Sequence, residues 1–286
     1  MVTDNGQSIL LSDLGLKVLD FIVSSISIEA EYQELEGGNV RVDMGANWGQ
    51  RTITVPVVLQ SNDSHDFPLA RDDVFGQLST LEPVKIRELR RIDGIESYVG
   101  GKYYQVRIQN QYEFEQIVNN GKGEIVFETV GIPFAESIGT SQTIHRNGID
   151  VDSGLWGFGM GLIDDPDSLI YTHDADVNAP FRIYNAGNVP VHPFEQKLKI
   201  TIRDVVGSTS AFQIINLTNG SRLRVNEQVN PSDVIVYDRA QVTRNGLALL
   251  RETDMSFIQL EPGWNNLRIY FCDTATIEFD FPFYYK

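Results

Sequence analysis

The densest group of side chains that could bind a metal ion follows the middle of the chain. Its members are five carboxylates and one imidazole: Asp164, Asp165, Asp167, His173, Asp174 and Asp176. Calcium is held by loops rich in carboxylate oxygens, but this run lacks the central glycine and the closing bidentate glutamate of an EF-hand loop. We therefore predict a solvated acidic loop and assign no metal site, with calcium binding as the alternative.

Zinc binding and catalysis have no recognisable pattern in the sequence. The histidines are His65, His145, His173 and His192, with no pair at i,i+4 and no HExxH motif. The nucleophile elbow GxSxG is also absent. Because triads and carboxylate pairs assemble from distant positions, a hydrolase stays as an alternative. The sequence itself predicts a protein that is not an enzyme, with no catalytic residue.

A glycine-rich run at residues 154–161 can be compared with a phosphate-binding loop. Its sequence is Gly-Leu-Trp-Gly-Phe-Gly-Met-Gly. Phosphate-binding loops need a preceding strand, a following helix and usually a lysine at the helix start. Here Asp164 and Asp165 follow instead, which places negative charge where a phosphate would sit. We predict a linker, and no cofactor.

Two tryptophans are candidates for stacking against sugar rings. Trp156 lies in the glycine-rich run, and Trp264 lies in the predicted turn Pro262-Gly-Trp-Asn-Asn266. Tryptophans in loops more often close the rim of a core or an interface, and we expect that role here. Glycan stacking by Trp156 and Trp264 is the alternative.

The basic cluster of the chain is Lys85-Ile-Arg-Glu-Leu-Arg-Arg91. We predict a single strand here, which would place Lys85, Arg87 and Arg91 on one face. The whole chain carries 39 acidic and 23 basic side chains, a formal net charge of −16. The three cations could therefore pair with carboxylates of a neighbouring subunit. Solvation of the same face is the alternative.

Charge and cysteine content exclude several classes of protein. The acidic balance argues against specific nucleic-acid binding, which needs lysine and arginine to displace counterions from phosphates. The single cysteine, Cys272, excludes a disulfide framework, and its neighbours Ile269-Tyr-Phe271 predict a buried, inert thiol. No stretch approaches the ~18 consecutive apolar residues of a membrane span. The N-terminus also lacks the basic region of a secretory signal, so we expect folding in a reducing cytoplasm without membrane contact.

The elements that would position these residues are mainly strands. Apolar and polar residues alternate in many short segments, for example at Ile53, Val55, Val57 and Leu59. Turn dipeptides separate them, and Asn219-Gly220 suits a type I′ hairpin, which has positive φ at both central residues. Short strands with such turns are typical of β-sandwiches and partly open barrels.

One helix is predicted, over residues 66–81. Asp66 would cap it, Pro68 suits its first turn, and four residues repeat along one face: Ala70, Val74, Leu78 and Leu81. This helix would close one side of the first sandwich. Residues 36–50 are long and glycine-rich, and we expect a mobile loop or an assembly hairpin there.

Residues 125–137 mark the end of one all-β region. Ile125 and Phe127 face the same way in a predicted buried strand, which Gly131 and Pro133 stop. The strand pattern then gives way to a glycine-rich, acidic connection. We predict two domains and a connecting passage, at residues 1–140, 179–286 and 141–178.

Eight segments in a fixed order carry a resemblance to a known family. They are residues 51–56, 69–81, 83–87, 101–107, 127–141, 181–193, 215–220 and 257–269. The most informative is Phe127-Glu-Thr-Val-Gly-Ile-Pro-Phe134, which ends the first all-β region. In this order and spacing the segments resemble the distal tail proteins of siphophages, which are baseplate hub components at the tip of a long non-contractile tail.

The resemblance implies a fold and a role. The fold would be mainly β, with an N-terminal tail-tube-like sandwich or split barrel with one helix, and a C-terminal galectin-like jelly-roll sandwich. The protein would be a structural subunit of a hexameric ring at the virion tail tip, which covers its exposed strand edges with neighbouring copies. Its partners would be the tail tube, a tail-associated fibre or lysin protein and receptor-binding proteins, with DNA passing through without specific binding. The alternative is a host-surface carbohydrate-binding module of a phage tail.

Overall fold

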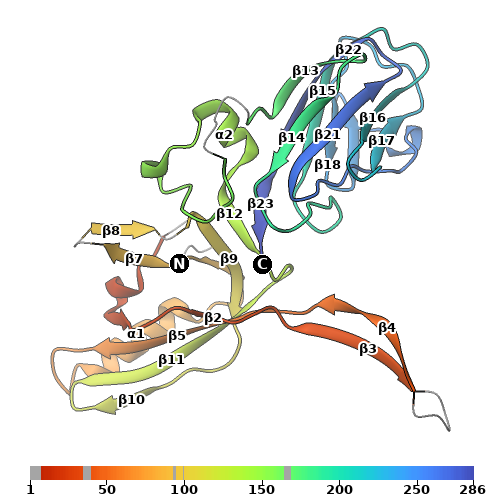
Figure 1. The fold of residues 1–286 in the computed structure, drawn as a ribbon. Coiled ribbons are helices and arrows are strands. Elements are labelled where there is room, and N and C mark those ends of the chain that lie inside the picture. The colour runs from red at the N-terminus through yellow and green to blue at the C-terminus, as the bar shows by residue number, and fades with distance from the viewer. Residues whose placement is uncertain (1–7, 35–39, 93–94, 99, 164–168) are drawn as a thin grey trace. The chain divides into compact units, whose positions relative to one another are not determined.

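A computed structural model describes residues 8–34, 40–92, 95–98, 100–163 and 169–286. The described chain is mainly β with two α-helices, which confirms the prediction of a mainly β protein. It divides into two compact units, residues 1–88, 103–135 and 286 in the first, and residues 89–102 and 136–285 in the second. Figure 1 traces the elements of each unit.

The first unit is built on an antiparallel sheet. Its strands run in the order β1 (Leu16–Val18), β5 (Thr52–Gln60), β11 (Asn120–Thr129) and β9 (Lys102–Ile108). Shorter strands pair with these: β2 (Ile22–Val23) with β5, β6 (Val84–Ile86) with β9, and β10 (Phe114–Ile117) with β11. The predicted alternation in β5 is confirmed, because its odd-numbered residues from Ile53 to Leu59 are buried. They form one core with Ile125 and Phe127 of β11.

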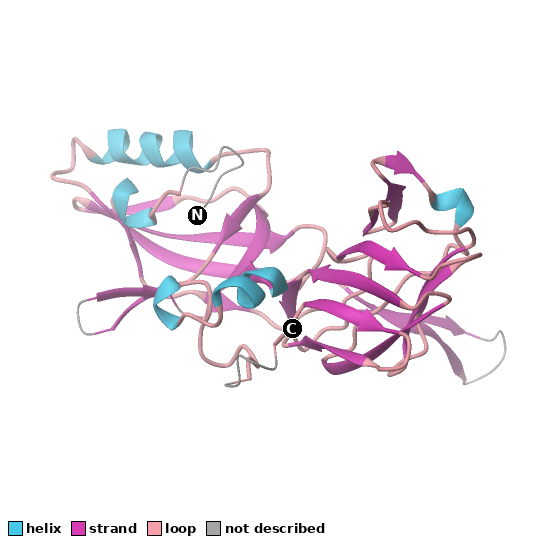
Figure 2. Ribbon diagram, turned by 90° about the horizontal axis from the view of Figure 1, so that it is seen from above, coloured by secondary structure: helices cyan, strands magenta, loops and turns pink. Residues whose placement is uncertain are grey.

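Helix α1 (Phe67–Leu78) covers this core, close to where the sequence predicts a helix. Figure 2 shows α1 lying along one face of the strands. Val74 and Leu78 are buried against the sheet. The predicted extension to Leu81 is wrong, because the helix ends at Leu78 and Leu81 is exposed.

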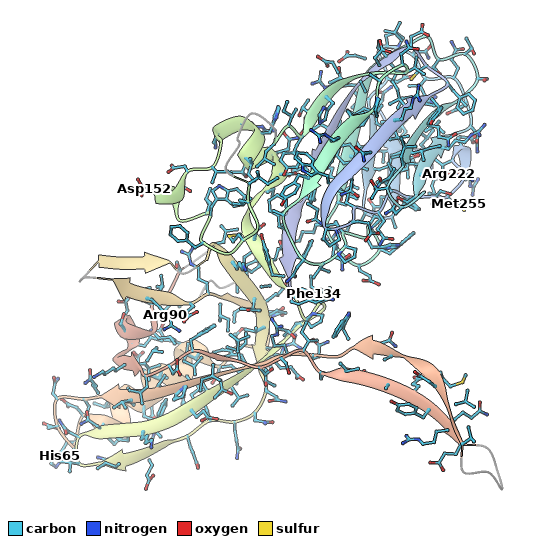
Figure 3. All side chains as sticks on the ribbon, viewed as in Figure 1. His65, Arg90, Phe134, Asp152, Arg222 and Met255 are labelled. Atoms are coloured by element: carbon cyan, nitrogen blue, oxygen red, sulfur yellow. The ribbon has the colours of Figure 1, made fainter. Side chains whose placement is uncertain are left out.

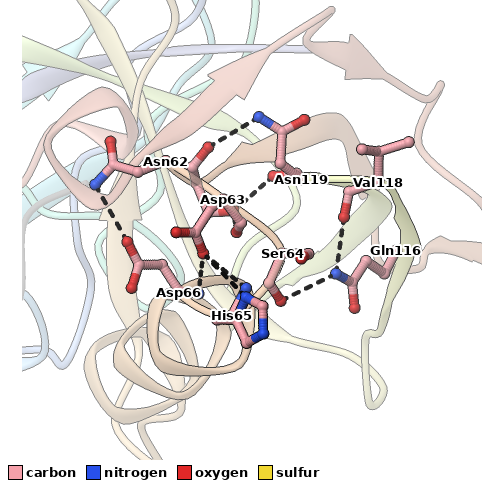
Figure 4. A network of polar contacts seen from close by, with 9 residues as sticks. Asn62, Asp63, Ser64, His65, Asp66, Gln116, Val118 and Asn119 are labelled. Atoms are coloured by element: carbon pink, nitrogen blue, oxygen red, sulfur yellow. Dashed lines mark hydrogen bonds and ion pairs between the residues drawn. The ribbon is translucent and has the colours of Figure 1, made fainter.

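The turn before α1 is held by Asp63 and not by the predicted cap. Asp66 occupies the N-cap position, but its side chain makes no capping bond. Instead, Asp63 Oδ1 accepts hydrogen bonds from the backbone N–H groups of His65, at 2.7 Å, and of Asp66, at 2.9 Å (Figure 4). Such local carboxylate-to-backbone bonds are the usual means by which aspartate fixes a turn.

The first unit also contains a two-stranded ribbon, which we call the arm. It consists of β3 (Ile28–Glu34) and β4 (Arg41–Trp48). In Figure 1 the arm projects away from the sheet that contains β5. For residues 36–50 the sequence leaves open a mobile loop or an assembly hairpin. Residues 36–39 lie outside the described part, and most of the remainder is one strand of a hairpin.

The second unit is a sandwich of two antiparallel sheets. The six-stranded sheet has the order β13 (Thr172–Asp176), β22 (Thr274–Asp280), β15 (Lys199–Val206), β18 (Ile235–Asp238), β19 (Gln241–Arg244) and β20 (Leu247–Ala248). The four-stranded sheet has the order β14 (Phe181–Asn185), β21 (Gly263–Tyr270), β16 (Phe212–Asn216) and β17 (Arg222–Val225). Alternate side chains of both sheets, such as Ile202, Ile277, Ile214 and Ile269, are fully buried and form the core.

Three further elements complete the described part of the second unit. They are a hairpin of β7 (Leu89–Ile92) and β8 (Ile95–Tyr98), a pair of β12 (Ala135–Thr140) and β23 (Pro282–Tyr285), and α2 (Ser141–Asn147). Short 3₁₀ turns occur at Leu11–Leu14 in the first unit and at Val151–Ser153 and Leu250–Glu252 in the second.

Helix α2 is absent from the sequence-based prediction. It begins with a capping box between Thr140 and Thr143. The Ser141 hydroxyl donates to the Phe279 carbonyl at 2.9 Å and accepts from the Phe281 N–H at 3.0 Å, so the start of α2 is joined to the C-terminal segment. Because the residues that make these bonds are polar, the helix has no repeating apolar pattern from which it could be predicted.

The glycine dipeptides differ from the prediction in one respect. At Asn219-Gly220 positive φ occurs only at Gly220, at 76°, so the predicted type I′ geometry is wrong there. Asn245 and Gly246 both have positive φ, at 51° and 81°, as a type I′ turn requires.

Candidate functional site

The arm buries none of the described side chains of its two strands. Every described strand position of β3 and β4 is exposed, on both faces. Ile28, Tyr32 and Met44 are 66%, 51% and 59% exposed. Figure 3 shows side chains standing away from the ribbon along the arm. A soluble monomer normally buries residues of this kind, so the arm has the composition of a surface that binds another protein.

The register of the arm sorts its side chains by face. Ile28 pairs with Trp48, and two residues further Ala30 pairs with Ala46. Since successive side chains of a strand alternate between faces, these residues share one face and Glu29 and Glu31 lie on the other. One face of this half of the arm is therefore apolar and the other is acidic.

A β-bulge bends the arm near its middle. The register shifts between Glu31 and Tyr32, opposite Gly45, which has φ of 114°. Asp43 Oδ1 accepts a hydrogen bond from the Gly45 N–H at 2.9 Å, which fixes this local geometry. Bulges of this kind increase the twist of a ribbon and re-aim its side chains. Beyond the bulge, the Arg41 guanidinium lies 4.2 Å from the centre of the Tyr32 ring.

The arm is an isolated two-stranded hairpin within the described residues, with unpaired strand edges and little stability of its own. β3 and β4 pair only with each other within the described residues, so each strand has a free edge with unpaired N–H and C=O groups. A two-stranded hairpin is marginally stable in water without a further layer. The arm is therefore suited to binding a partner protein, to which it offers a strand edge and an apolar face.

The predicted basic strand is not a single strand. β6 (Val84–Ile86) ends before Arg87, and β7 (Leu89–Ile92) begins after Glu88 in the other unit. Lys85 is exposed, with Nζ 4.4 Å from the centre of the Tyr103 ring, and Arg87 is half-buried. The side chain of Arg91 lies outside the described part. The prediction that Lys85, Arg87 and Arg91 share one strand face is therefore wrong.

The two tryptophans have different environments. Trp156 is 4% exposed and lies 6.1 Å from the Phe283 ring, so it offers no free face to a sugar, and the alternative of glycan stacking does not fit its burial. Trp264 is half-buried, and its ring contacts the Arg182 guanidinium at 4.5 Å and the Tyr184 ring at 4.9 Å. Part of the ring surface is therefore occupied by Arg182 and Tyr184.

The glycine-rich run at 154–161 folds as a closely packed loop. A Cβ at Gly161 would lie 2.5 Å from the Ala186 carbonyl oxygen, so glycine is needed for this approach. The loop is also tied by the Tyr285 hydroxyl, which donates to the Met160 carbonyl at 2.9 Å. These contacts give Gly161 a packing role.

The acidic run is described only in part. Asp164, Asp165 and Asp167 lie outside the described residues. Asp174 and Asp176 are on β13 or at its end, where Asp174 accepts from the Thr276 hydroxyl at 2.8 Å and Asp176 accepts from the Asn178 N–H at 2.7 Å. Among the described residues, no three His, Cys, Asp or Glu side chains converge on a possible metal position.

Cys272 is buried, as the sequence predicts. Burial, together with the neighbouring Asp273 carboxylate, raises the pKa of its thiol to about 12. The thiol is therefore protonated at neutral pH, and the thiolate that would act as a nucleophile is scarce.

His173 provides a testable pH dependence. Its ring is half-buried, lies 4.9 Å from the Phe181 ring and contacts the Ile170 carbonyl oxygen through Nε2 at 3.0 Å. Burial lowers the pKa of His173, and the nearby His145 lowers it further, against the opposing effects of the Ile170 and Arg182 carbonyls and of Asp174. The unfolded chain therefore takes up this proton first as pH falls.

The coupling between protonation of His173 and folding sets the direction in which stability changes with pH. The free energy of unfolding should be highest above the unfolded histidine pKa of about 6.5 and should decrease as pH falls through the lower folded pKa. We expect His173→Gln to reduce the loss of stability between about pH 7 and pH 5 in urea unfolding. His65→Gln, at an exposed position, is the control for the loss of one imidazole. Equal profiles for all three proteins would contradict this assignment.

No helix in the described part of the chain has the length and apolar character required to cross a membrane.

Comparison with known protein families assigns both halves of the chain. A family model for a phage tail protein RIFT-related domain matches residues 5–129. A second, for the C-terminal domain of a siphovirus-type tail component, matches residues 187–283. Together the two models account for most of the chain. No curated protein sequence is similar enough to count as a relative.

A similar solved structure covers nearly the whole chain. The Dit (gp 19.1) protein of phage SPP1, described as a paradigm of the hub adsorption apparatus in phages that infect Gram-positive bacteria, matches with a TM-score of 0.62 and 15% identity. The match covers 96% of this chain and 95% of that chain, and it shows a shared fold. Baseplate structures of phage p2 in the activated conformation, with Ca and with Sr, match at 11% and 10% identity with a TM-score of 0.36. Each covers 94% of this chain and 90% of that chain, and these matches are too weak to support an argument.

Proposed function

The chain belongs to the siphophage distal tail proteins, structural components of the virion tail, and from this premise we propose that it is a ring subunit of the tail-tip hub. The ring, a hexamer in this proposal, would join the tail tube to a tail-associated fibre or lysin protein and would let DNA pass without specific binding. Receptor-binding proteins would be further partners. The protein would act as a scaffold and not as an enzyme.

The observation that carries the proposal is the arm. It presents apolar residues such as Ile28, Val42 and Met44 to solvent, together with free strand edges. A contact between the arm of one subunit and a different surface of the next is head-to-tail, and such a contact closes into a ring when its rotation permits. Closure would cover the arm of every copy at once.

Two further predictions from the sequence enter the proposal, the first unchanged and the second reduced to one residue. The division into residues 1–140, 141–178 and 179–286 is retained as a proposal for the domains. Lys85 is retained as a single exposed cation that could contact the neighbouring subunit, without Arg87 and Arg91 as one face. The carbohydrate-binding alternative is not proposed, because Trp156 is buried and the ring of Trp264 already packs against Arg182 and Tyr184.

Native mass spectrometry and electron microscopy of the purified protein test the proposal. We expect closed rings, either from the protein alone or after addition of the tail tube protein and the fibre or lysin protein from the same phage. The measurement with the partner proteins added is needed because some rings close only on their partners. A protein that remained monomeric and bound neither partner would rule the proposal out.

A further inference from the structure

The four-stranded sheet of the second unit has an outer face rich in arginine. Alternate residues of its strands point away from the core, and on this outer face they include Arg182, Trp264, Arg268, Tyr270, Arg222 and Arg224. The pairing of β16 with its neighbours places Ile215 between Arg268 and Arg222, and Gln213 between Tyr270 and Arg224. The topology thus brings four guanidinium groups from β14, β21 and β17 onto one face.

Three of these guanidinium groups lack a carboxylate partner among the described residues. Arg182 lies 4.5 Å from the centre of the Trp264 ring, and Arg224 lies 4.9 Å from that of Phe271. Arg268 donates from Nε to the Val177 carbonyl at 2.9 Å. Arg222 is the exception, with Nε 3.0 Å from Asp254 Oδ2. The Nε atom of Arg224 is also buried without a hydrogen-bond partner.

The outer face of the six-stranded sheet is different. There Lys199 pairs in register with Asp238 on one side and with Asp280 on the other. Arg203 contacts Asp204 at 2.9 Å. Cations on that sheet are therefore matched by carboxylates, as expected in a chain with a net charge of −16. The uncompensated arginines are a local property of the other face.

The chemistry of the arginine face defines what it can bind. A guanidinium group presents planar N–H donors that match carboxylates, and aromatic rings hold two of these groups in place. Because Arg182 packs against the Trp264 ring, the ring supports the guanidinium. Exposed apolar side chains flank the face, with Leu217 50% and Phe271 49% exposed. Arginine, tryptophan and tyrosine beside apolar residues is the composition of energetically important protein interfaces.

We propose that this arginine face is a docking surface for a carboxylate-rich segment of a partner protein. Charge complementarity selects an acidic partner, and the apolar flanks select a polypeptide over a polysaccharide. The inference goes beyond the proposed ring, because the face belongs to the second unit and the arm belongs to the first. It can therefore hold or fail without regard to ring closure.

The test uses the full-length protein and a fluorescent peptide of about ten residues that alternates glutamate with leucine, a length that spans a sheet face. We expect saturable binding by fluorescence anisotropy that weakens as salt rises. Arg182→Gln should weaken the affinity by about tenfold, and Arg182→Gln/Arg224→Gln by roughly a further tenfold. Arg203→Gln, on the balanced sheet, is the matched control and should change the affinity by less than about twofold. Circular dichroism of each variant verifies that it is folded.

Competition identifies the class of ligand. A peptide that alternates lysine with leucine should not bind, and polygalacturonate or a thymidine oligonucleotide at equal charge concentration should displace the acidic peptide poorly. Efficient displacement by the carboxylated sugar would assign the face to an acidic glycan and overturn the proposal. So would the absence of binding, or an equal loss of affinity in Arg203→Gln.

Discussion

Replacing Trp156 with alanine is expected to lower the free energy of unfolding by about 3–5 kcal/mol, the range for removal of a large buried aromatic side chain. Trp156 is 4% exposed, and its ring lies 6.1 Å from that of Phe283. The space for the ring is made by Gly139, where a Cβ would lie 2.4 Å from Trp156 Cζ2. The ring anchors the glycine-rich loop to the pair of β12 and β23, so its loss leaves a cavity and releases the loop.

Trp264→Ala is the matched control. Trp264 is half-buried, and its main contacts are with Arg182 and Tyr184 at the surface of the sandwich. Its removal should cost about 1 kcal/mol, the scale of a surface cation–π contact with some lost packing. Urea unfolding followed by far-UV circular dichroism measures both variants. A larger loss in Trp264→Ala than in Trp156→Ala would contradict the assignment of their environments.

Gly139→Ala gives an independent check on the same contact. The added methyl group would collide with the Trp156 ring, so the substitution alone should cost roughly 1–3 kcal/mol. In the Trp156→Ala background the collision is gone, and the same substitution should cost clearly less. This non-additivity is the signature of two residues in direct contact. Additive effects on the free energy of unfolding would contradict direct contact between Gly139 and the Trp156 ring.

The environment of Trp156 shows what the sequence could not provide. The sequence places Trp156 in a glycine-rich loop and leaves open whether it closes the rim of a core or stacks against a sugar, because the local sequence contains no apolar periodicity there. Its burial depends on Gly139 and Phe283, which lie far away along the chain. Long-range packing of this kind leaves no local pattern in a single sequence. The alternation of β5 and the face of α1 were predictable because they are set by neighbours two to four residues away.

The arm and the basic run illustrate the same limit at the level of elements. Residues 36–50 contain several glycines, which favour a loop, yet Gly45 serves a bulge within a strand. The alternation from Lys85 to Arg91 continues through Arg87 and Glu88, where the structure ends one strand and starts another. Periodicity predicts that residues are extended, but it does not state which strand they pair with. Here β6 pairs with β9 and β7 pairs with β8, and alternation alone indicates neither pairing.

Removing the arm is expected to abolish ring closure and to leave a folded subunit. The chain can be closed at the base of the arm because Gly49 N–H donates to the Ser27 carbonyl at 2.9 Å. A short glycine-serine turn can therefore replace residues 28–48 without displacing β5. Since every described strand position of the arm is exposed, the deletion removes no described side chain that is buried. Its stability should change by no more than about 1 kcal/mol, as for surface changes in general.

The expected effect on assembly is much larger. Burial of each large apolar side chain contributes about 1.5–3 kcal/mol, so loss of several should weaken association by at least about a hundredfold. Analytical ultracentrifugation over a range of concentrations measures this shift, with the tail tube protein present where the ring requires it. Tyr32→Ser/Met44→Ser keeps the ribbon and should weaken association to an intermediate degree, since both side chains are exposed in the isolated subunit.

The two variants separate the possible roles of the arm. If the shortened protein is folded and still forms rings with unchanged affinity, the arm is not the subunit contact and the proposed function loses its main support. If the shortened protein unfolds, the arm contributes to the first unit in a way that its exposed side chains do not explain. A folded monomer from the deletion, together with a weakened ring from Tyr32→Ser/Met44→Ser, would require that the apolar side chains themselves make the contact. Strand-edge pairing alone would survive the double substitution, because backbone hydrogen bonds do not depend on those side chains.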